Sequence, residues 1–320
     1  MGRFVRRPVG RRLLVRIAER RCVVKVVTVS TQKGGAGKTT SAVHLAVGLN
    51  RAGYRVLVVD LDAQAHASKW LLPAIPRDAL GAAGVLESGE PPAEEDLLPV
   101  PNRPGLSVLP ASLALRKSNI TLRENPGADR VLSSALAPIG GSFDFCIIDT
   151  PPAVELVTYN ALAAADYVLV PVTSAFLALD GLGELQKTLE LVRSRTNPRL
   201  EVLGYLHLAV TKGYSNSTEV REILQKKQGS KLLKCEIRTS SVQMTIAAHR
   251  LTAWDKEAGD ERGLEDWTAV QAEILGRMGV KAAAKPATAK KQASPKSKAV
   301  TTARSVKGTA KVPARKARAT

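Results

Sequence analysis

A glycine-rich stretch, QKGGAGKT, runs from Gln32 to Thr39 with a lysine at each end of its glycines. Glycine lets the backbone take unusual conformations and lets a ligand approach the main-chain amides. The β-branched run VVKVVTVS before it is typical of a buried strand, and TSAVHLAVGLNRAG after it is typical of a helix that Gly53 ends. A strand, glycine loop and helix in this order direct N–H groups and a helix N-terminus at one point, which predicts a phosphate-binding loop.

The stretch departs from the general nucleotide-binding pattern G-x-x-x-x-G-K-[ST] in an informative way. Gly37, Lys38 and Thr39 match the end of the pattern, but Gln32 stands where its first glycine belongs. An additional lysine, Lys33, comes directly before Gly34. The loop therefore carries two cations where the general pattern has one.

Three aspartates follow apolar segments that we expect to be strands. Asp60 and Asp62 lie near the end of VLVVDLDAQ, and Asp149 lies in FDFCIIDTPP. One such aspartate could merely cap a turn. Because parallel strands end at one edge of a sheet, three of them beside a phosphate loop favour binding of Mg²⁺ through water.

Strand-like and helix-like segments alternate along the chain, which predicts an α/β fold with a doubly wound, mostly parallel sheet. The segment from Pro73 to Pro104, rich in Pro, Gly and acids, is expected to be a variable surface excursion. Expected strands are Val23–Ser30, Arg55–Asp60, Ser107–Leu109, Asp144–Asp149, Tyr167–Val172, Val202–Val210 and Leu232–Ile237, and expected helices are Gly181–Arg195, Glu219–Lys227 and Leu264–Met278.

The net charge of +18 is concentrated at the two ends. Residues 1–25 carry a net +8, residues 281–320 a net +12, and the part between them −2. We expect a basic N-terminal arm over 1–22, a globular domain with the phosphate-binding loop over 23–280 and a disordered Lys/Ala/Pro-rich tail over 281–320. The arm is either a DNA-contacting segment or the product of a start codon assigned too early. The tail favours polyphosphate contact over mere solubilisation.

The composition excludes several classes of protein. The sequence contains no apolar run of about eighteen residues, so it predicts no membrane span. No apolar signal-peptide core follows the N-terminus. Cys22, Cys146 and Cys235 match no metal-binding spacing, and Cys146 is expected to be a small core residue. We expect a cytoplasmic protein.

Three further segments carry a resemblance to a known family. The loop K-G-G-x-G-K-T-T resembles the deviant Walker A loop of ParA/MinD ATPases. YRVLVVDLDAQ, DFCIIDTPP and VLVPVTSAFLALDGL are similar to ParA-family segments, in the family's order and approximate spacing. The resemblance covers about residues 23–278. The chain is therefore identified as a member of the ParA family of P-loop ATPases.

The resemblance implies ATP and Mg²⁺ as cofactors and a role for each matching residue. Lys38 would contact the β- and γ-phosphates, Lys33 would reach the nucleotide of a partner subunit, and Asp62 would orient the attacking water. Catalysis is thus expected from Lys33, Lys38 and Asp62. Metal binding is expected from Thr39, Asp60 and Asp149, and nucleotide binding from Lys33, Gly34, Gly35, Ala36, Gly37, Lys38, Thr39 and Thr40.

Two departures from the family affect finer detail. Ala63 replaces the proline of the usual Asp-Pro-Gln, and EIRTSSVQMTIAAHR replaces a Pro-Arg followed by a Ser-Glu-Ala-Pro-like run. The segment that frames adenine is left open. DNA contacts are expected from Arg238 and Arg250 and, in the tail, from Lys290, Lys291, Lys296, Lys298, Arg315 and Lys316.

The resemblance implies a DNA-segregation switch: an ATP-bound homodimer on non-specific DNA, with slow hydrolysis stimulated by a ParB-like or cargo-adaptor protein. Alternatives are positioning of a protein cargo on the nucleoid and a MinD-like surface switch, although the tail lacks an amphipathic helix. The chain lacks the paired cysteines that a metal-cluster reductase needs. It is also too short after the ATPase motifs for the glutaminase domain of an amidotransferase. A tail-only DNA binder would ignore nucleotide.

Overall fold

The computed structural model describes residues 24–280 apart from 77, 78, 80, 124–126, 154, 175–179, 212 and 214. Both predicted basic segments, 1–22 and 281–320, lie outside the described residues. The tail positions expected to contact DNA, Lys290, Lys291, Lys296, Lys298, Arg315 and Lys316, lie there too.

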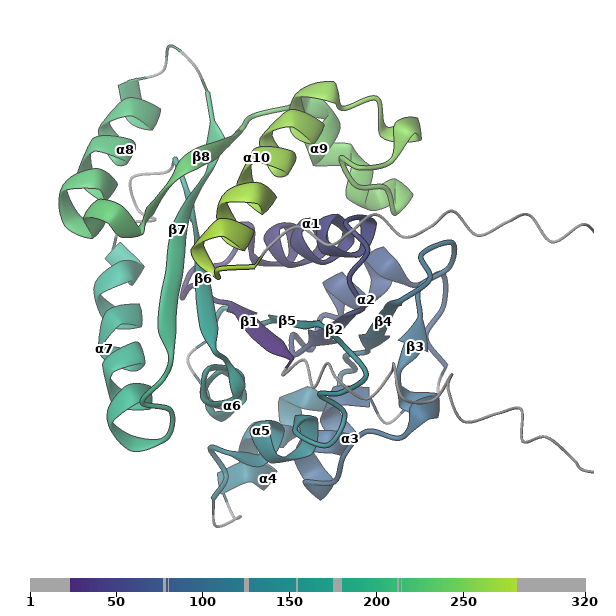
Figure 1. Cartoon of the computed structure of the whole chain (residues 1–320). Coiled ribbons are helices and arrows are strands. Elements are labelled where there is room, and N and C mark those ends of the chain that lie inside the picture. Colours follow the sequence, from purple (N-terminus) through teal and green to yellow (C-terminus); the bar gives the residue numbers. More distant parts are fainter. Residues whose placement is uncertain are drawn as a thin grey trace, which may run out of the picture. The chain divides into compact units, whose positions relative to one another are not determined.

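A sheet of eight strands in the order β3-β4-β2-β5-β1-β6-β7-β8 forms the centre of the fold (Figure 1). All neighbouring strands are parallel except β3 and β4. The carboxyl ends of the parallel strands therefore meet at one edge. The strands are β1 Lys25–Val29, β2 Val56–Asp60, β3 Leu98–Pro99, β4 Leu106–Leu109, β5 Phe145–Asp149, β6 Tyr167–Thr173, β7 Glu201–Val210 and β8 Leu232–Arg238.

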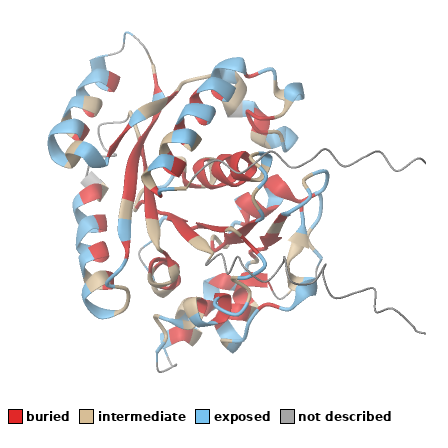
Figure 2. Cartoon of the chain, in the orientation of Figure 1, coloured by how far each residue is buried: buried red, intermediate tan, exposed pale blue. Residues whose placement is uncertain are grey.

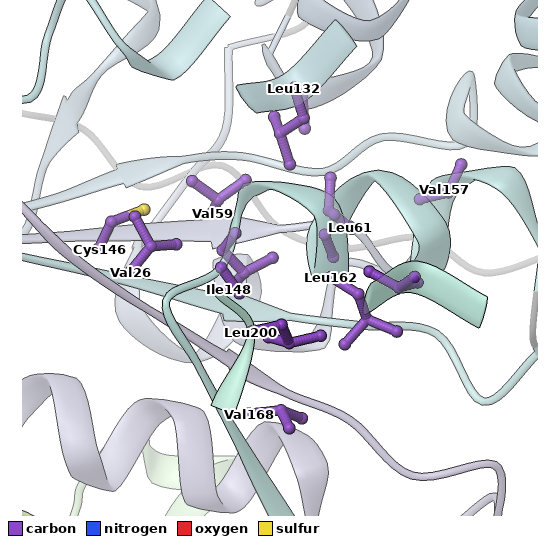
Figure 3. Close-up of a cluster of buried hydrophobic side chains, with 14 of the residues drawn as sticks. Val26, Val59, Leu61, Leu132, Cys146, Ile148, Val157, Leu162, Val168 and Leu200 are labelled. Carbon is purple, nitrogen blue, oxygen red and sulfur yellow. The ribbon is translucent and has the colours of Figure 1, made fainter. Parts of the chain in front are cut away.

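The central strands are apolar on both sides because helices cover both faces of the sheet. In β1, Val26 points into one core, while Val27 and Val29 point into the other. In β5, Cys146 and Ile148 alternate with their neighbours in the same way (Figure 3). This two-residue alternation is the geometry of a strand with two buried faces.

Two layers of helices enclose the sheet, and their inward faces are the buried ones (Figure 2). One core contains side chains of α3 to α8, and the other contains those of α1, α2, α10 and the segment that joins β8 to α10. The helices are α1 Lys38–Arg51, α2 His66–Leu71, α3 Gly81–Ser88, α4 Leu115–Arg123, α5 Val131–Leu136, α6 Leu156–Ala164, α7 Asp180–Arg195, α8 Ser215–Gln228, α9 Ser241–Thr245 and α10 Glu261–Arg277, with short 3₁₀ turns η1 Glu94–Asp96, η3 Gly229–Lys231, η4 Ile246–His249 and η5 Lys256–Ala258.

The predicted α/β class and all seven predicted strands are confirmed, with bounds that shift by one or two residues. Cys146 is a core residue, as expected, and so are Leu182, Leu185, Leu189 and Val192 of α7. In the described part of the chain no helix is long and apolar enough to cross a membrane.

The interpretation of Pro73–Pro104 as a surface excursion is wrong in its middle. This segment contains α3, in which Ala82, Ala83, Val85 and Leu86 are buried in the core that α3 shares with α4 and α5. It also contributes the antiparallel edge strand β3. Small apolar residues suffice here because the helix packs closely, so the segment's glycines and alanines serve packing as well as turns.

Candidate active site

The glycine loop connects β1 to α1 at the carboxyl edge of the sheet. Gly35 and Gly37 have φ angles of +68° and +82°, in the left-handed region that favours glycine. A Cβ on Gly34 or Gly35 would meet no other atom within 4 Å, so both face open space. A Cβ on Gly37 would lie 2.4 Å from Leu208 Cδ1. The loop is thus packed at its base and open where a ligand would approach.

Lys38, the first residue of α1, folds back over the loop. Its Nζ donates to the main-chain oxygen of Lys33 at 2.9 Å, and 7% of the residue is exposed. Burial lowers the pKa of Lys38, although Asp149 and Asp62 oppose the shift. The ammonium therefore gains most from an anion placed at the loop.

Asp149 ends β5 directly beneath the loop and is fully buried. Its Oδ2 accepts a hydrogen bond of 2.7 Å from Thr39 Oγ1, while its Oδ1 has no partner among the described residues. Burial first, and then Asp60, raise the pKa of Asp149 well above its usual range. A buried carboxylate oxygen without a donor is costly unless a ligand or water completes it.

Asp60 ends β2 and pairs in register with Asp149 of β5. Its Oδ2 accepts from Ser68 N at 2.8 Å and Ser68 Oγ at 2.7 Å, and its Oδ1 accepts from Asp62 N at 3.1 Å. Burial raises the pKa of Asp60 to about 6, against the effect of these bonds. Both oxygens are thus already engaged, and Asp60 holds the turn that carries Asp62.

Asp62 is half-buried, and its Oδ1 accepts from Gln64 N at 2.9 Å. The turn continues through Ala65, whose φ of +56° is unusual for a residue other than glycine. The strand ends are also joined directly, because Thr150 Oγ1 donates to Val29 O at 2.9 Å. The loop and the aspartates are therefore parts of one rigid edge.

These residues fit a phosphate ligand accompanied by Mg²⁺. Within the residues described, no group of three His, Cys, Asp or Glu side chains could hold a metal ion by itself. Mg²⁺ in nucleotide sites usually takes one or two protein oxygens and completes its shell with phosphate and water. Thr39 Oγ1 and the partnerless Asp149 Oδ1 provide such oxygens beside the open loop.

A cavity of about 280 Å³ opens next to the loop, between the ends of β7 and β8 and helix α10. Two donors at this cavity, Gln243 Nε2 and Trp267 Nε1, are buried and lack a partner among described residues. The walls are Gly35, Gly37, Thr40, Thr173, Leu208, Ala209, Ile237, Arg238, Thr239, Ser240, Gln243 and Trp267. The cavity is therefore apolar with a few polar groups, as small-molecule sites are.

The structure places the two predicted DNA-contacting arginines of the folded domain differently. The Arg238 guanidinium is bound by Asp266 at 2.6 Å and by Glu265 at 3.2 Å, beside the cavity. Arg250 is exposed at the end of η4 with a φ of +56°, and it has no ion pair with any described residue. Of the two, Arg250 is the one free to meet a phosphate.

The eight predicted loop residues, Asp60, Asp62 and Asp149 all lie at this edge, as the strand–loop–helix interpretation requires. Sequence reasoning missed Ser68, Gln243 and Trp267. Ser68 lies in α2, the helix that follows the Asp60 turn. A serine at such a position is only a weak sequence signal for a site residue. Gln243 and Trp267 come from helices about two hundred residues away, and no local pattern predicts that approach.

Sequence comparison identifies relatives of this chain. A family model described as AAA domain matches residues 24–202. The chain is 39% identical over 185 residues to the chromosome partitioning protein ParA of Myxococcus xanthus (strain DK1622), covering 58% of this chain and 64%, less than two thirds, of that protein. It is 35% identical over 211 residues to the chromosome partitioning protein ParA of Caulobacter vibrioides (strain NA1000 / CB15N), covering 65% and 78%.

Comparison with solved structures agrees on the fold. A Mycobacterium smegmatis protein described as cobyrinic acid a,c-diamide synthase, solved with a bound ATP analog and magnesium, is 32% identical with a TM-score of 0.64. The match covers 71% of this chain and 92% of that one. The glycine loop with its two lysines, the aspartates at the ends of β2 and β5, and these matches together show that the chain belongs to the ParA family of deviant Walker A P-loop ATPases.

Proposed function

We propose that this chain is a ParA-like ATPase that binds ATP and Mg²⁺ at the glycine loop and uses hydrolysis to time DNA segregation. The observation that carries the proposal is the convergence of Lys38, Thr39 and Asp149 at a loop whose Gly34 and Gly35 face open space. A triphosphate would satisfy the lysine and complete the coordination beside the aspartate. This is the arrangement that phosphoryl transfer needs, because positioning and charge stabilisation supply most of its catalysis.

Each residue has a defined task in this proposal. Lys38 turns from the Lys33 oxygen to the β- and γ-phosphates. Thr39 Oγ1 would hold Mg²⁺, and Asp149 would orient Thr39 and a water of the metal. When bound, Mg²⁺ would supply positive charge that offsets the negative charge of the phosphates. Asp60 keeps the Asp62 turn in place, and Asp62 positions the attacking water.

Lys33 is proposed to act on the nucleotide of a second subunit. Its side chain is half-buried and its ammonium has no partner among the described residues, while its main-chain oxygen holds Lys38. A cation inserted from a partner offsets charge in the transition state, as an arginine finger does. ATP would then be part of the dimer interface, so dimerisation would depend on nucleotide.

The cavity of about 280 Å³ beside the loop is proposed to hold the adenosine part of the nucleotide. It adjoins Gly37 and Thr40, where a chain of phosphates bound at the loop would end. Gln243 Nε2 and Trp267 Nε1 would supply donors to the base or ribose. The Arg238 ion pair with Asp266 would form one wall.

The biological role proposed is partition of plasmid or chromosomal DNA in the cytoplasm, on the nucleoid. An ATP-bound homodimer would bind non-specific DNA, and a ParB-like or adaptor protein would stimulate slow hydrolysis and so release it. Two chromosome partitioning relatives support this role. The same cycle could position a protein cargo or drive a MinD-like surface switch, which the DNA experiment below separates.

A second candidate comes from the Mycobacterium smegmatis relative, which is described as a diamide synthase. Formation of an amide from glutamine would need a reactive cysteine. Burial raises the pKa of Cys146 to about 12, and burial followed by Glu273 raises that of Cys235. Neither thiol in the described part of the chain is therefore suited to be a nucleophile. We expect no amide product from cobyrinic acid with ATP and either glutamine or ammonia. Product formation would make synthesis the primary activity.

The test is duplex DNA binding without nucleotide, with ADP and with ATP–Mg²⁺, measured on the full chain and on a chain that ends at residue 280. ATP hydrolysis is followed in parallel, with Lys38→Ala as the variant that should lose both nucleotide binding and hydrolysis. If ATP strengthens DNA binding in both chains, the folded domain is a nucleotide-gated DNA binder. If binding ignores nucleotide in both, DNA partition is wrong and the ATPase times a protein contact.

A further inference from the structure

His44 lies in the middle of α1, the helix that begins at the phosphate loop, and it is completely buried. The chain contains three tryptophans, and each of them contacts this residue. The Trp267 ring stacks on the imidazole, with centroids 4.5 Å apart and planes at 13°. The Trp70 ring meets it edge-on at 5.6 Å and 86°, and Trp254 Nε1 donates to the His44 main-chain oxygen at 3.1 Å. His44 therefore lies where α1, α2, α10 and the segment before α10 meet.

Two hydrogen bonds fix the orientation of the His44 ring. Its Nδ1 lies 2.8 Å from the Thr40 oxygen, which can only accept, so Nδ1 is the donor. In a neutral imidazole Nε2 is then the acceptor, and Ala253 N donates to it at 3.2 Å. Burial lowers the pKa of His44 to about 4, so the ring is neutral at physiological pH. The imidazole is thus held as a fixed, flat surface between two segments of main chain.

Trp267 stands between this fixed ring and the cavity of about 280 Å³ beside the loop. It is only 1% exposed, yet its Nε1 lacks a partner among the described residues. A buried polar group in a folded protein normally has a partner, so a cavity ligand that carries an acceptor would complete it. Because an indole is flat and has a single N–H, stacking on His44 sets the direction in which that N–H points.

The contact between α1 and α10 is close at the turn after His44 as well. A Cβ on Gly48 would lie 2.6 Å from Trp254 Cζ2 and 2.7 Å from Gln271 Oε1, so the missing side chain permits this approach. Gln271 Nε2 donates to the Gly48 oxygen at 3.0 Å. This bond joins the same two helices as the His44 stack does, but Gln271 is not a wall of the cavity. Gln271 therefore offers a matched control.

We propose that His44 is a positioning residue for nucleotide recognition, because it fixes the Trp267 indole so that Nε1 meets an acceptor on the adenosine part of ATP. The proposal rests on the proposed function, which places adenosine in this cavity. It adds the residue that sets the affinity for the nucleoside separately from the affinity for the phosphates. His44 acts through Trp267, and a small displacement of a recognition group is enough to weaken binding.

A histidine that only filled the core would behave differently. Since α1 also carries Lys38 and Thr39, a general loosening of α1 would weaken binding of any phosphate ligand. A displaced Trp267 indole would weaken only ligands that contain a nucleoside. Tripolyphosphate with Mg²⁺ has the phosphates without the nucleoside, so comparing its affinity with that of ATP–Mg²⁺ separates the two roles.

The test is titration of the full chain and of His44→Gln with both ligands. Glutamine keeps an oxygen that can accept from Ala253 N, but it removes the ring on which Trp267 stacks. We expect the Kd for ATP–Mg²⁺ to rise about tenfold, the effect of about one hydrogen bond, and the Kd for tripolyphosphate–Mg²⁺ to change less than about twofold. KM for ATP should rise with Kd, while turnover at saturating ATP should change less than about twofold.

Three further variants sharpen the test. His44→Phe keeps a flat ring under Trp267 and should raise the Kd for ATP by no more than about threefold. Trp267→Phe removes the N–H and should weaken ATP binding about as much as His44→Gln does. Because both changes act through one hydrogen bond, the double variant should bind ATP no more weakly than Trp267→Phe alone. Gln271→Ala should leave the affinity for both ligands unchanged.

Several outcomes would overturn the role of His44. These are equal losses of ATP and tripolyphosphate affinity in His44→Gln, additive losses in the double variant, or full ATP affinity in His44→Gln while Trp267→Phe binds ATP weakly. The last result would leave the adenosine cavity in place. If the wild-type chain binds ATP no more tightly than tripolyphosphate and Trp267→Phe changes neither affinity, the cavity does not hold adenosine, and that part of the proposed function is wrong together with the role of His44.

Discussion

The two edges of the sheet treat buried carboxylates in opposite ways. At the carboxyl edge, burial raises the pKa of Asp60 to about 6 and that of Asp149 well above its usual range. At the opposite edge, where β7 and β8 begin, burial also acts to raise the pKa of Glu273, but hydrogen bonds from Lys234 N, Cys235 N and Arg277 outweigh it and lower the pKa. Asp149 thus keeps an oxygen without a partner among the described residues, whereas hydrogen bonds within the chain satisfy Glu273.

The difference shows which edge is built to receive a ligand inside the fold. Asp149 Oδ1 lacks a partner within the described region, and the Lys38 ammonium rests on a neutral carbonyl oxygen. At the opposite edge, Glu273 is satisfied by two main-chain amides and Arg277. The arrangement at the carboxyl edge therefore favours a small ligand that brings both anion and cation.

Lys33→Ala tests the carboxyl edge most severely. If Lys33 completes the site of a second subunit, hydrolysis should fall by about 10³-fold, as when an arginine finger is removed. Nucleotide affinity should change by no more than a few-fold, since Lys38 and the loop amides remain. Steady-state turnover and nucleotide titration measure the two effects. Lys69→Ala is the control, because Lys69 Nζ donates to Gln64 O near the same turn. Unchanged turnover in Lys33→Ala would remove the role in trans.

Asp62→Ala should reduce hydrolysis by about 10²-fold or more, because the attacking water loses its orienting carboxylate. ATP should then remain bound, and the dimer should persist on a sizing column where the wild-type chain returns to a monomer. Gln64→Ala keeps the turn and serves as the control. Hydrolysis at the wild-type rate would refute the role of Asp62.

Asp60→Asn tests the comparison of the buried carboxylates by measuring how the free energy of unfolding depends on pH. The folded pKa of Asp60 is about 6 against an ordinary 3.8, so between these values the folded state keeps a proton that the unfolded state has released. The free energy of unfolding therefore falls as pH rises through this window, by about 3 kcal/mol in total. The amide does not titrate, so it removes this pH dependence, but its NH₂ group cannot accept the bond that Asp60 Oδ1 receives from Asp62 N. The free energy of unfolding of Asp60→Asn relative to that of wild type should therefore rise by about 2–3 kcal/mol between pH 4 and pH 7.5.

Urea unfolding of the nucleotide-free chain at several pH values measures this difference. Hydrolysis should fall in the same variant, because stability gained at a functional edge is commonly offset by lost function. Parallel stability curves for wild type and Asp60→Asn would mean that the Asp60 carboxyl is not strained, and the contrast with Glu273 would fail.

Local signals account for what could be predicted from sequence. The loop, Asp60 and Asp149 were predictable because each follows a strand within a few residues, and strand ends share an edge whatever the strand order. The eight-stranded order was not predicted, because hydrophobic alternation does not specify which strands pair. Gln243 of α9 and Trp267 of α10 reach the cavity only through tertiary packing, so no short pattern contains them.

Helix α3 illustrates the opposite kind of error. Gly, Pro and acids around it suggested a surface segment, yet Ala82 and Ala83 pack in the core because small side chains let the helix lie close.

Glu273→Gln gives the smallest expected effect. It tests whether the hydrogen bonds of Glu273 stabilise the edge of the sheet where β7 and β8 begin. Losing a charge that accepts from two amides and one guanidinium should cost about 2 kcal/mol of unfolding free energy at pH 7.5. The pKa of Glu273 is lowered in the fold, so its stabilisation is present above the ordinary pKa and is lost as pH falls through the lowered one. The cost of the substitution should therefore shrink toward pH 3.

Glu222→Gln, exposed on α8, is the control and should cost almost nothing at any pH. ATP hydrolysis should be unchanged in both, since the loop lies at the other edge. A fall in hydrolysis in Glu273→Gln alone would mean that the two edges of the sheet are coupled through β8 and α10.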